Sequence, residues 1–208
     1  MKIQVLKTDY PNIEYLRKLY LQENNFQIRY NSCHERGWSD SYLLKLDDQI
    51  VGYGSVKGLE NLSDRDTIFE FYLMPPFRNY SRNFFSKLIS ESKVIYTESQ
   101  TNDLLTTSMV YEFSKDIQSE VVLFEDHTTT HFEMPNVNFR KRRVGEVLTD
   151  KKENDMGEYI LEKNGKIVAT GGFLTHYNMP FADLYMETDK NHREQGFAQF
   201  IIQEIKKE

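Results

Sequence analysis

The sequence is poor in cysteine and has no long apolar run. Cys33 is its only cysteine, which excludes an internal disulfide framework and suits a reducing compartment. No run approaches the roughly 18 apolar residues that a membrane-spanning helix needs. The first residues lack the apolar region of a signal peptide. These absences predict a cytoplasmic protein without a membrane partner.

Positive charge is also in short supply. The chain carries 26 Lys and Arg against 32 Asp and Glu, a net charge of −6, whereas a nucleic-acid partner usually requires a basic face. Apolar residues reach 39 % and aromatic residues 13 %, and disordered chains are poor in both. We therefore expect a globular protein with no nucleic-acid partner. Its length of 208 residues allows one large domain or two small ones.

Two segments of the chain match each other position by position. Residues 42–54 and residues 159–171 each consist of an apolar run, a polar turn and a second apolar run, which predicts a β-hairpin. The second turn is Asn164-Gly165, the strongest short hairpin signal, because both residues accept the positive φ of a type I′ turn. Asp47-Asp48 fills the first turn less well.

The match resumes further along the chain. Residues 68–73 and residues 182–187 predict strands, and each is followed by a polar turn and a helix. The apolar residues of the second helix fall on one face: Phe197, Phe200, Ile201 and Ile205. Two matching blocks at nearly the same shift favour an internal duplication over two unrelated hairpins.

The two copies differ in their surroundings. The first follows a predicted strand and an amphipathic helix, and it continues after its own helix with further elements: strand 94–97, helix 102–113 and strand 119–124. The second follows a strand-like segment, residues 137–142, and ends with its helix. A polar stretch near residues 125–136 separates the copies. We therefore expect two domains, residues 1–126 and residues 137–208, the second incomplete after its helix.

The turn before the last helix carries a pattern that can bind an anion. Arg193, Gly196 and Ala198 form the spacing R-x-x-G-x-A at a helix start. The first amides of a helix have no partner inside the helix and lie at the positive end of its dipole. A glycine there lets a pyrophosphate approach the backbone closely. The pattern is weak alone, and its place after a hairpin and a strand makes it more specific.

At these residues the sequence resembles the GNAT acyltransferase superfamily. Its acyl-CoA motif, Q/R-x-x-G-x-G/A, lies between the fourth strand and the following helix. The resemblance covers residues 159–208 and implies an α/β (α+β) fold with a mixed, mostly antiparallel sheet flanked by helices, here duplicated. It implies acetyl-CoA as co-substrate and no metal. It also assigns residues to CoA binding: Met186, Glu187 and Thr188 to pantetheine, and Arg193, Glu194, Gln195, Gly196, Phe197 and Ala198 to the pyrophosphate loop.

The first half has the family's order of elements but an eroded motif. Ser81 replaces the glycine, Asn83 replaces the small residue, and Pro75-Pro76 precede the loop. We therefore expect this half to be a degenerate domain that does not bind CoA. Tyr111 resembles the tyrosine that protonates the departing thiolate in active members. Without a working CoA loop in the same half, a structural role for Tyr111 is the alternative.

His176 and Glu187 are the candidates for relaying a proton from an amine. His176 lies between the second hairpin and the expected CoA-binding strand, and Glu187 lies on that strand. Either residue can also be an ordinary surface residue. For His127 and His131 we favour structural roles over a metal pair, because the three threonines between them favour strand or turn. For the basic run at residues 140–143 we favour a solvated strand end over a phosphate patch.

Together these patterns predict an acyl-CoA-dependent N-acyltransferase. A bound primary amine of a small molecule would attack the thioester of acetyl-CoA directly, in a ternary complex. The alternative is a non-catalytic acyl-CoA-binding, structural or interaction module, which the incomplete second half favours. The open strand edge of that half also predicts possible self-association.

Overall fold

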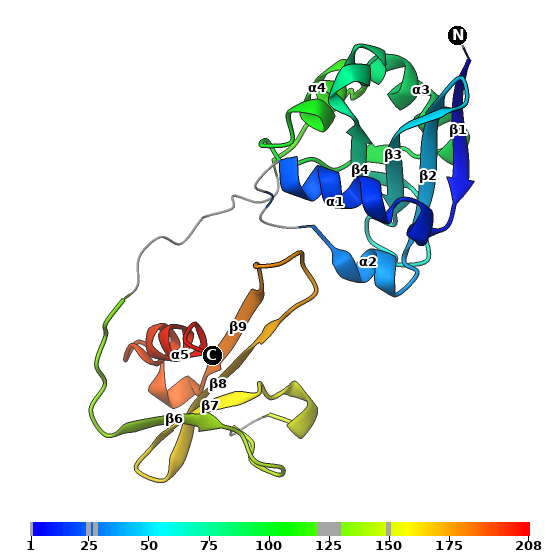
Figure 1. The fold of residues 1–208 in the computed structure, drawn as a ribbon. Helices are drawn as coiled ribbons and strands as arrows, with labels where there is room; N and C mark the ends of the chain where they lie inside the picture. Colours follow the sequence, from blue (N-terminus) through cyan, green and yellow to red (C-terminus); the bar gives the residue numbers. More distant parts are fainter. Residues whose placement is uncertain (1, 24–25, 27–28, 120–129, 149–150) are drawn as a thin grey trace. The chain divides into compact units, whose positions relative to one another are not determined.

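The computed structural model describes residues 2–23, 26, 29–119, 130–148 and 151–208 (Figure 1). Contacts between Cα atoms divide the chain into unit 1, Met1–Leu123, and unit 2, Phe124–Glu208. Each unit combines a largely antiparallel sheet with helices, so the predicted α+β fold class is confirmed. No helix in the described ranges is long and apolar enough to cross a membrane.

A five-stranded sheet in the order β1-β2-β3-β4-β5 forms the centre of unit 1. Neighbours from β1 to β4 pair antiparallel, whereas the short β5 pairs parallel with β4, which makes the sheet mixed as predicted. The strand bounds are β1 Ile3–Thr8, β2 Ser39–Leu46, β3 Gln49–Lys57, β4 Thr67–Leu73 and β5 Tyr96–Thr97.

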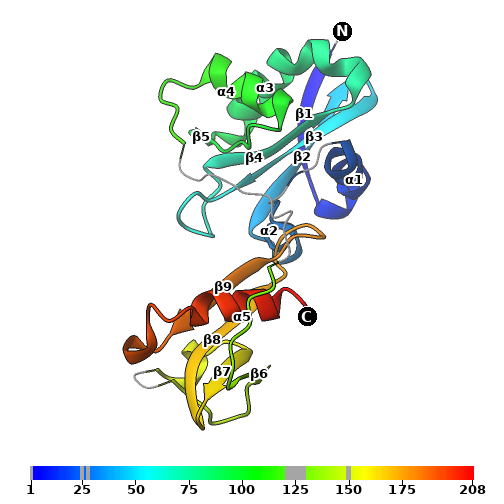
Figure 2. The same cartoon turned by 90° about the vertical axis from the view of Figure 1, so that its left-hand side faces the viewer.

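Helices cover both faces of this sheet (Figures 1 and 2). Successive residues of a strand point to opposite faces, and Tyr72 of β4 packs with Leu16 of α1 while its neighbour Phe71 packs with Phe85 of α3. A charged residue buried in β4 can therefore meet partners from a covering helix as well as from the neighbouring strand. The helical bounds are η1 Tyr10–Asn12, α1 Glu14–Glu23, α2 Asn31–Glu35, η2 Pro75–Tyr80, α3 Ser81–Ser92 and α4 Leu104–Phe113.

Unit 2 has a four-stranded antiparallel sheet in the order β6-β7-β8-β9. The four apolar residues predicted to share one helix face are all buried on α5, which packs against β7, β8 and β9. The bounds are β6 Val137–Lys141, η3 Glu153–Asp155, β7 Tyr159–Lys163, β8 Lys166–Leu174, β9 Asp183–Thr188, η4 Lys190–His192 and α5 Phe197–Ile205.

The two matching hairpins share a register irregularity. The pairing shifts between Leu44 and Lys45 in the first hairpin and between Leu161 and Glu162 in the second, which are equivalent positions of the matching segments. In the second turn Asn164 has φ 52° and Gly165 has φ 76°, which confirms the predicted left-handed turn. A shared bulge is a specific backbone feature, and the duplication itself stays a prediction.

Some predicted elements differ from the structure. The predicted strand 94–97 is reduced to β5, because the amides of Ile95 and Tyr96 both donate to the carbonyl of Asp66, at 2.9 and 3.0 Å. The predicted helix 102–113 begins at Leu104, because the Asp103 side chain caps it by accepting from the amide of Thr106. The short helix α2 was not predicted. Residues 120–124 of the last predicted strand, and His127, lie outside the described residues.

Candidate functional site

The predicted anion-binding loop follows β9 and is positioned by Asp189. The amide of Asp189 donates to the carbonyl of Val168 on β8 at 2.9 Å, which ties the end of β9 to the sheet. Its carboxylate accepts from the amide of Asn191 and contacts Nδ1 of His192, both at 2.9 Å. The hydrogen bonds from His192 and from the Asn191 amide lower the pKa of Asp189. This turn directs residues 193–196, the motif loop, onto the start of α5.

Gly196 caps α5 in a backbone conformation that favours glycine. Its φ is 85° and its ψ is 1°, in the left-handed region. A Cβ at this position would lie 3.3 Å from Cζ of Phe132 and 3.4 Å from Cε of Met134. The motif therefore requires glycine for the shape of the main chain as well as for the close approach of a ligand. The sequence pattern predicted only the close approach of a ligand.

The motif loop and the first turn of α5 have amides available for a ligand. Within the described chain, no acceptor pairs with the backbone amides of Glu194, Gln195, Phe197 or Ala198. The first backbone donor of α5 with a partner is Phe200, whose amide donates to the carbonyl of Gly196 at 3.0 Å. Free amides at the positive end of a helix suit a phosphate group.

The equivalent loop of unit 1 is closed by its own interactions. The 3-10 helix η2 runs directly into α3, so the amides of Phe77 and Ser81 already donate to the carbonyls of Met74 and Arg78. Nε of Arg78 donates to the carbonyl of Leu73 at 3.1 Å, and its Nη2 pairs with the carboxylate of Glu23. These contacts occupy backbone groups of this loop, and the absence of CoA binding by unit 1 stays a prediction.

A small pocket in unit 1 lies beside that closed loop. It is lined by residues from β4, α1, α4 and η2, including Tyr72, Glu23 and Asp103. Burial and the neighbouring carboxylate of Glu23 raise the pKa of Tyr72 to about 12. The phenol therefore stays protonated at neutral pH, and the pocket presents a neutral hydroxyl next to a carboxylate.

The three predicted proton-transfer residues lie in different surroundings. Glu187 pairs with Nζ of Lys151 at 2.7 Å. His176 lies in the β8–β9 loop, where its ring meets the Tyr177 ring edge-on at 4.2 Å. β9 begins at Asp183, which is four residues from Glu187, a span of about 13 Å along a strand. The loop that holds His176 therefore joins β9 at the opposite end from Glu187. Tyr111 belongs to unit 1, where it is 73 % exposed on α4.

The strand residues predicted to contact pantetheine lie at an accessible edge of the unit 2 sheet. Thr188 pairs with Ala169 and Met186 pairs with Gly171, while β9 has no strand on its other side in the described chain. The Met186 side chain is 40 % exposed. The backbone of β9 is therefore unpaired along one strand edge in the described chain, which suits an extended ligand arm.

Sequence reasoning missed a buried charge cluster in unit 1. Glu70 of β4 is fully buried, with Nε of Arg17 at 3.0 Å, the Tyr53 hydroxyl at 2.9 Å and Nε2 of His34 at 3.1 Å, all to Oε2. Burial would raise the pKa of Glu70, but the charge of Arg17 and the contact with His34 outweigh it and lower that pKa. The sequence signal that could have revealed this cluster is Glu70 itself, a single carboxylate inside an apolar strand. A buried charge of this kind must be paired. The cluster ties α1 and α2 to the sheet.

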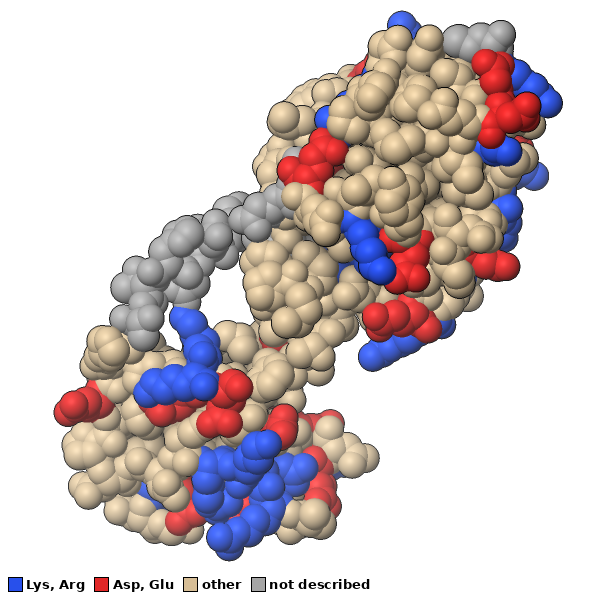
Figure 3. All heavy atoms as spheres, viewed as in Figure 1, with Lys and Arg blue, Asp and Glu red and all other residues tan. Residues whose placement is uncertain are grey.

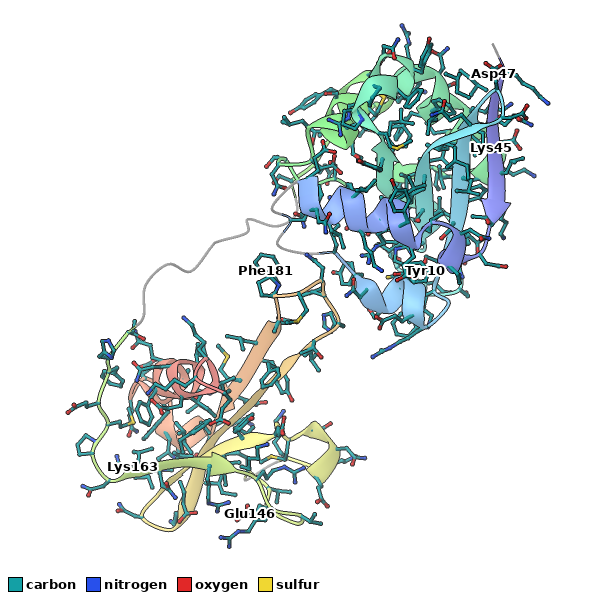
Figure 4. All side chains as sticks on the ribbon, in the orientation of Figure 1. Tyr10, Lys45, Asp47, Glu146, Lys163 and Phe181 are labelled. Atoms are coloured by element: carbon teal, nitrogen blue, oxygen red, sulfur yellow. The ribbon has the colours of Figure 1, made fainter. Side chains whose placement is uncertain are left out.

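The basic run at residues 140–143 lies within a set of ion pairs on unit 2. Arg140 reaches Glu146 and Glu162, both at 2.7 Å, and Lys141 pairs with Glu158 at 3.4 Å. Figure 3 shows the Lys and Arg side chains of this unit next to Asp and Glu, and Figure 4 places Glu146 on the loop after β6. The run thus lies in ion pairs at the end of β6, where a solvated strand end was predicted in preference to a phosphate patch.

The ion pairs of Arg140 predict a pH effect at Glu146. Hydrogen bonds from Arg140 and from the amide of Arg143 lower the pKa of Glu146 from 4.5 to about 2. Because the folded-state pKa lies below the unfolded one, its stabilising contribution is present above pH 4.5 and is lost as the pH falls towards 2. An NMR titration of the Glu146 carboxyl will show a midpoint near 2 that rises in Arg140→Met. A midpoint near 4.5 in the unaltered protein would contradict this ion-pair geometry.

A family model matches more than half of this chain. The model of the acetyltransferase (GNAT) domain family matches residues 10–127. A GNAT-family acetyltransferase from Colwellia psychrerythraea is 17 % identical, and its alignment covers 100 % of this chain and 85 % of that chain at a TM-score of 0.58, which shows a shared fold. Ribosomal-protein-alanine N-acetyltransferase from Brucella melitensis biovar Abortus 2308 is 10 % identical, over 60 % and 100 % of the two chains, with a TM-score of 0.43. No curated protein matches the sequence.

Proposed function

Because the chain belongs to the acetyltransferase (GNAT) domain family, whose members are N-acetyltransferases, we propose that it transfers the acetyl group of acetyl-CoA to a primary amine of a small molecule. The motif loop carries this proposal. It combines Gly196 in the left-handed conformation with several amides that have no partner in the described chain, and it follows β9, whose outer edge is unpaired there. This combination suits a ligand with a diphosphate and an extended arm.

We assign acetyl-CoA to unit 2. The pyrophosphate would accept hydrogen bonds from the amides of residues 194–198, and pantetheine would lie along residues 186–188 of β9. The family match spans unit 1 instead, so the two halves have different roles in the proposal. Unit 1 is the degenerate copy of a duplicated domain, with its loop closed by Arg78 and η2.

The proposed reaction is a direct transfer. The lone pair of the bound amine attacks the thioester carbonyl, the new C–N bond forms, the C–S bond breaks, and the thiolate of CoA leaves and takes up a proton. The amine must lose a proton, and Glu187 or His176 would accept it directly or through water. Nζ of Lys151 lies 2.7 Å from the Glu187 carboxylate and would hold this candidate base in one place. Tyr111, exposed on unit 1, is the weakest of the three candidates.

Calorimetry with acetyl-CoA tests the proposal. We expect the protein to bind one acetyl-CoA and to release free CoA when a panel of primary amines is added. Glu187→Gln and His176→Asn separate the two candidate bases, because substitution of the correct one lowers kcat by far more than it weakens acetyl-CoA binding. No binding of acetyl-CoA would refute the proposal. Binding without turnover of any amine would instead favour a non-catalytic acyl-CoA-binding module.

Substitution at Ser81 gives an independent prediction for unit 1. Ser81→Gly restores the glycine of the motif, but the amides around it remain bonded within η2 and α3. We therefore expect the affinity and the stoichiometry of acetyl-CoA binding to stay unchanged in calorimetry. A second bound acetyl-CoA, or a loss of affinity, would assign a CoA site to unit 1.

The free edge of β9 makes self-association a further part of the proposal. Within the described residues β9 pairs only with β8, whereas the equivalent β4 is also paired with β5. An unpaired strand edge can pair with another chain, and a lysine there opposes such pairing. We expect sedimentation to show concentration-dependent dimers that Tyr185→Lys reduces. A protein that sediments as a monomer at every concentration would contradict this.

A further inference from the structure

A buried glutamine holds the segment before β6 against α5. Gln203 of α5 is 6 % exposed. Its Oε1 accepts a hydrogen bond from the amide of Phe132 at 2.7 Å, and its Nε2 donates one to the carbonyl of Phe132 at 2.9 Å. Residues 131–134, the strap, run beside α5 in both ribbon views (Figures 1 and 2). One side chain thus satisfies both backbone groups of Phe132 and fixes this residue on the helix.

The ring of Phe132 is held in place without being buried. It meets the ring of Phe200 edge-on, with a centroid distance of 6.2 Å and an interplanar angle of 70°. It nevertheless stays 41 % exposed. Single exposed apolar side chains are ordinary. The main chain of Phe132 differs in that both its amide and its carbonyl are hydrogen-bonded to Gln203. Its ring is therefore presented to solvent in one place.

The ring also borders the motif loop. Its Cζ lies 3.3 Å from where a Cβ of residue 196 would be, so it stands directly beside the cap of α5. The strap leads into β6 at one edge of the sheet, and β9 is at the other edge. A CoA whose diphosphate lies on the loop and whose pantetheine follows β9 sends its nucleotide away from β9. Phe132 belongs to the strap, which leads to the sheet edge away from β9.

We propose that the ring of Phe132 stacks on the adenine of acetyl-CoA, and that Gln203 is the positioning residue that holds the ring for it. The inference rests on the proposed function, because it needs the diphosphate on the motif loop. Stacking of a base on an aromatic side chain is a substantial favourable contact. A ring that is already immobilised loses little further entropy when the base binds.

Two ligands separate stacking from a structural effect. Acetyl-CoA carries the adenine, and acetyl-4′-phosphopantetheine keeps the thioester, the arm and one phosphate but lacks the nucleotide. Phe132→Leu keeps an apolar side chain on the strap and removes the aromatic face. We expect it to weaken acetyl-CoA binding on the order of tenfold in calorimetry, and to leave the binding of acetyl-4′-phosphopantetheine unchanged. Phe132→Tyr retains the face and restores the affinity for acetyl-CoA.

Gln203→Ala and Val147→Ala complete the comparison. Gln203→Ala frees the strap, so we expect the same selective loss as in Phe132→Leu. Val147 is also 41 % exposed in unit 2, and its replacement controls for the loss of exposed apolar surface. Equal losses for both ligands in Phe132→Leu, or no loss for acetyl-CoA, would overturn the stacking and leave the proposed function standing. An unaltered protein that binds neither ligand would refute both.

Discussion

Gly196→Val will abolish detectable binding of acetyl-CoA, with a loss of at least about 100-fold in affinity, which corresponds to two steps of 1.4 kcal/mol. At φ 85° a β-branched residue is a steric outlier, so the first turn of α5 must change its backbone conformation. The new Cβ would also press on Phe132, 3.3 Å away. Both effects displace the amides that would hold the pyrophosphate. Calorimetry with acetyl-CoA measures the loss.

Gly145→Val is the matched control for this substitution. Gly145 has nearly the same left-handed backbone, with φ 83°, and a Cβ there would meet no atom within 4 Å. Backbone strain of about 1–3 kcal/mol should lower the stability of both variants to a similar extent. Only Gly196→Val should lose acetyl-CoA. If Gly145→Val loses it as well, or if Gly196→Val still binds, then the motif loop is not the pyrophosphate site.

Glu70→Gln will lower the free energy of unfolding of unit 1 by about 3–5 kcal/mol, the usual cost of breaking a buried ion pair by removing one partner. The substitution keeps the size of the side chain and removes its charge. Arg17, whose side chain is 5 % exposed, is then left buried beside a neutral group. Because the partners of Glu70 come from α1 and α2, these helices should loosen first. Urea unfolding followed by circular dichroism measures the change.

Two further variants give this prediction its controls. Glu14→Gln removes a carboxylate from an exposed pair with Lys18 on the same unit, at 2.8 Å, and should change stability little. The double variant Arg17→Met with Glu70→Leu replaces the buried pair by apolar side chains and should be more stable than the sum of its single changes predicts. A small loss in Glu70→Gln, comparable to that in Glu14→Gln, would mean that the cluster does not hold the fold together.

The same cluster predicts a pH dependence. The folded-state pKa of Glu70 lies below its ordinary value of 4.5. The stability it contributes is therefore present above pH 4.5 and is lost as the pH falls below that value. Glu70→Gln should flatten the dependence of the unfolding free energy on pH in the acid range. An unchanged slope would show that other carboxylates dominate acid unfolding.

The elements that sequence reasoning found are those with local signals. The left-handed turn at Asn164 and Gly165 depends on those two residues alone, and the buried face of α5 follows from helical periodicity. The start of α5 was also recognisable, because the glycine motif is contained in a few consecutive residues. α2, with five residues, has no sustained periodicity, and its place is decided by contacts such as that of His34 with Glu70.

The sequence by itself determined the strands of the repeated hairpin, the buried face of α5 and the motif loop, because turn chemistry and periodicity act between near neighbours in the chain. Only the tertiary structure decided which charges and rings meet. Arg17 and Glu70 are 53 positions apart, and Phe132 and Gln203 are 71 positions apart. No pattern along the chain encodes such distances. They follow from the packing of α1 on β4 and of the strap on α5, where buried polar groups must find partners.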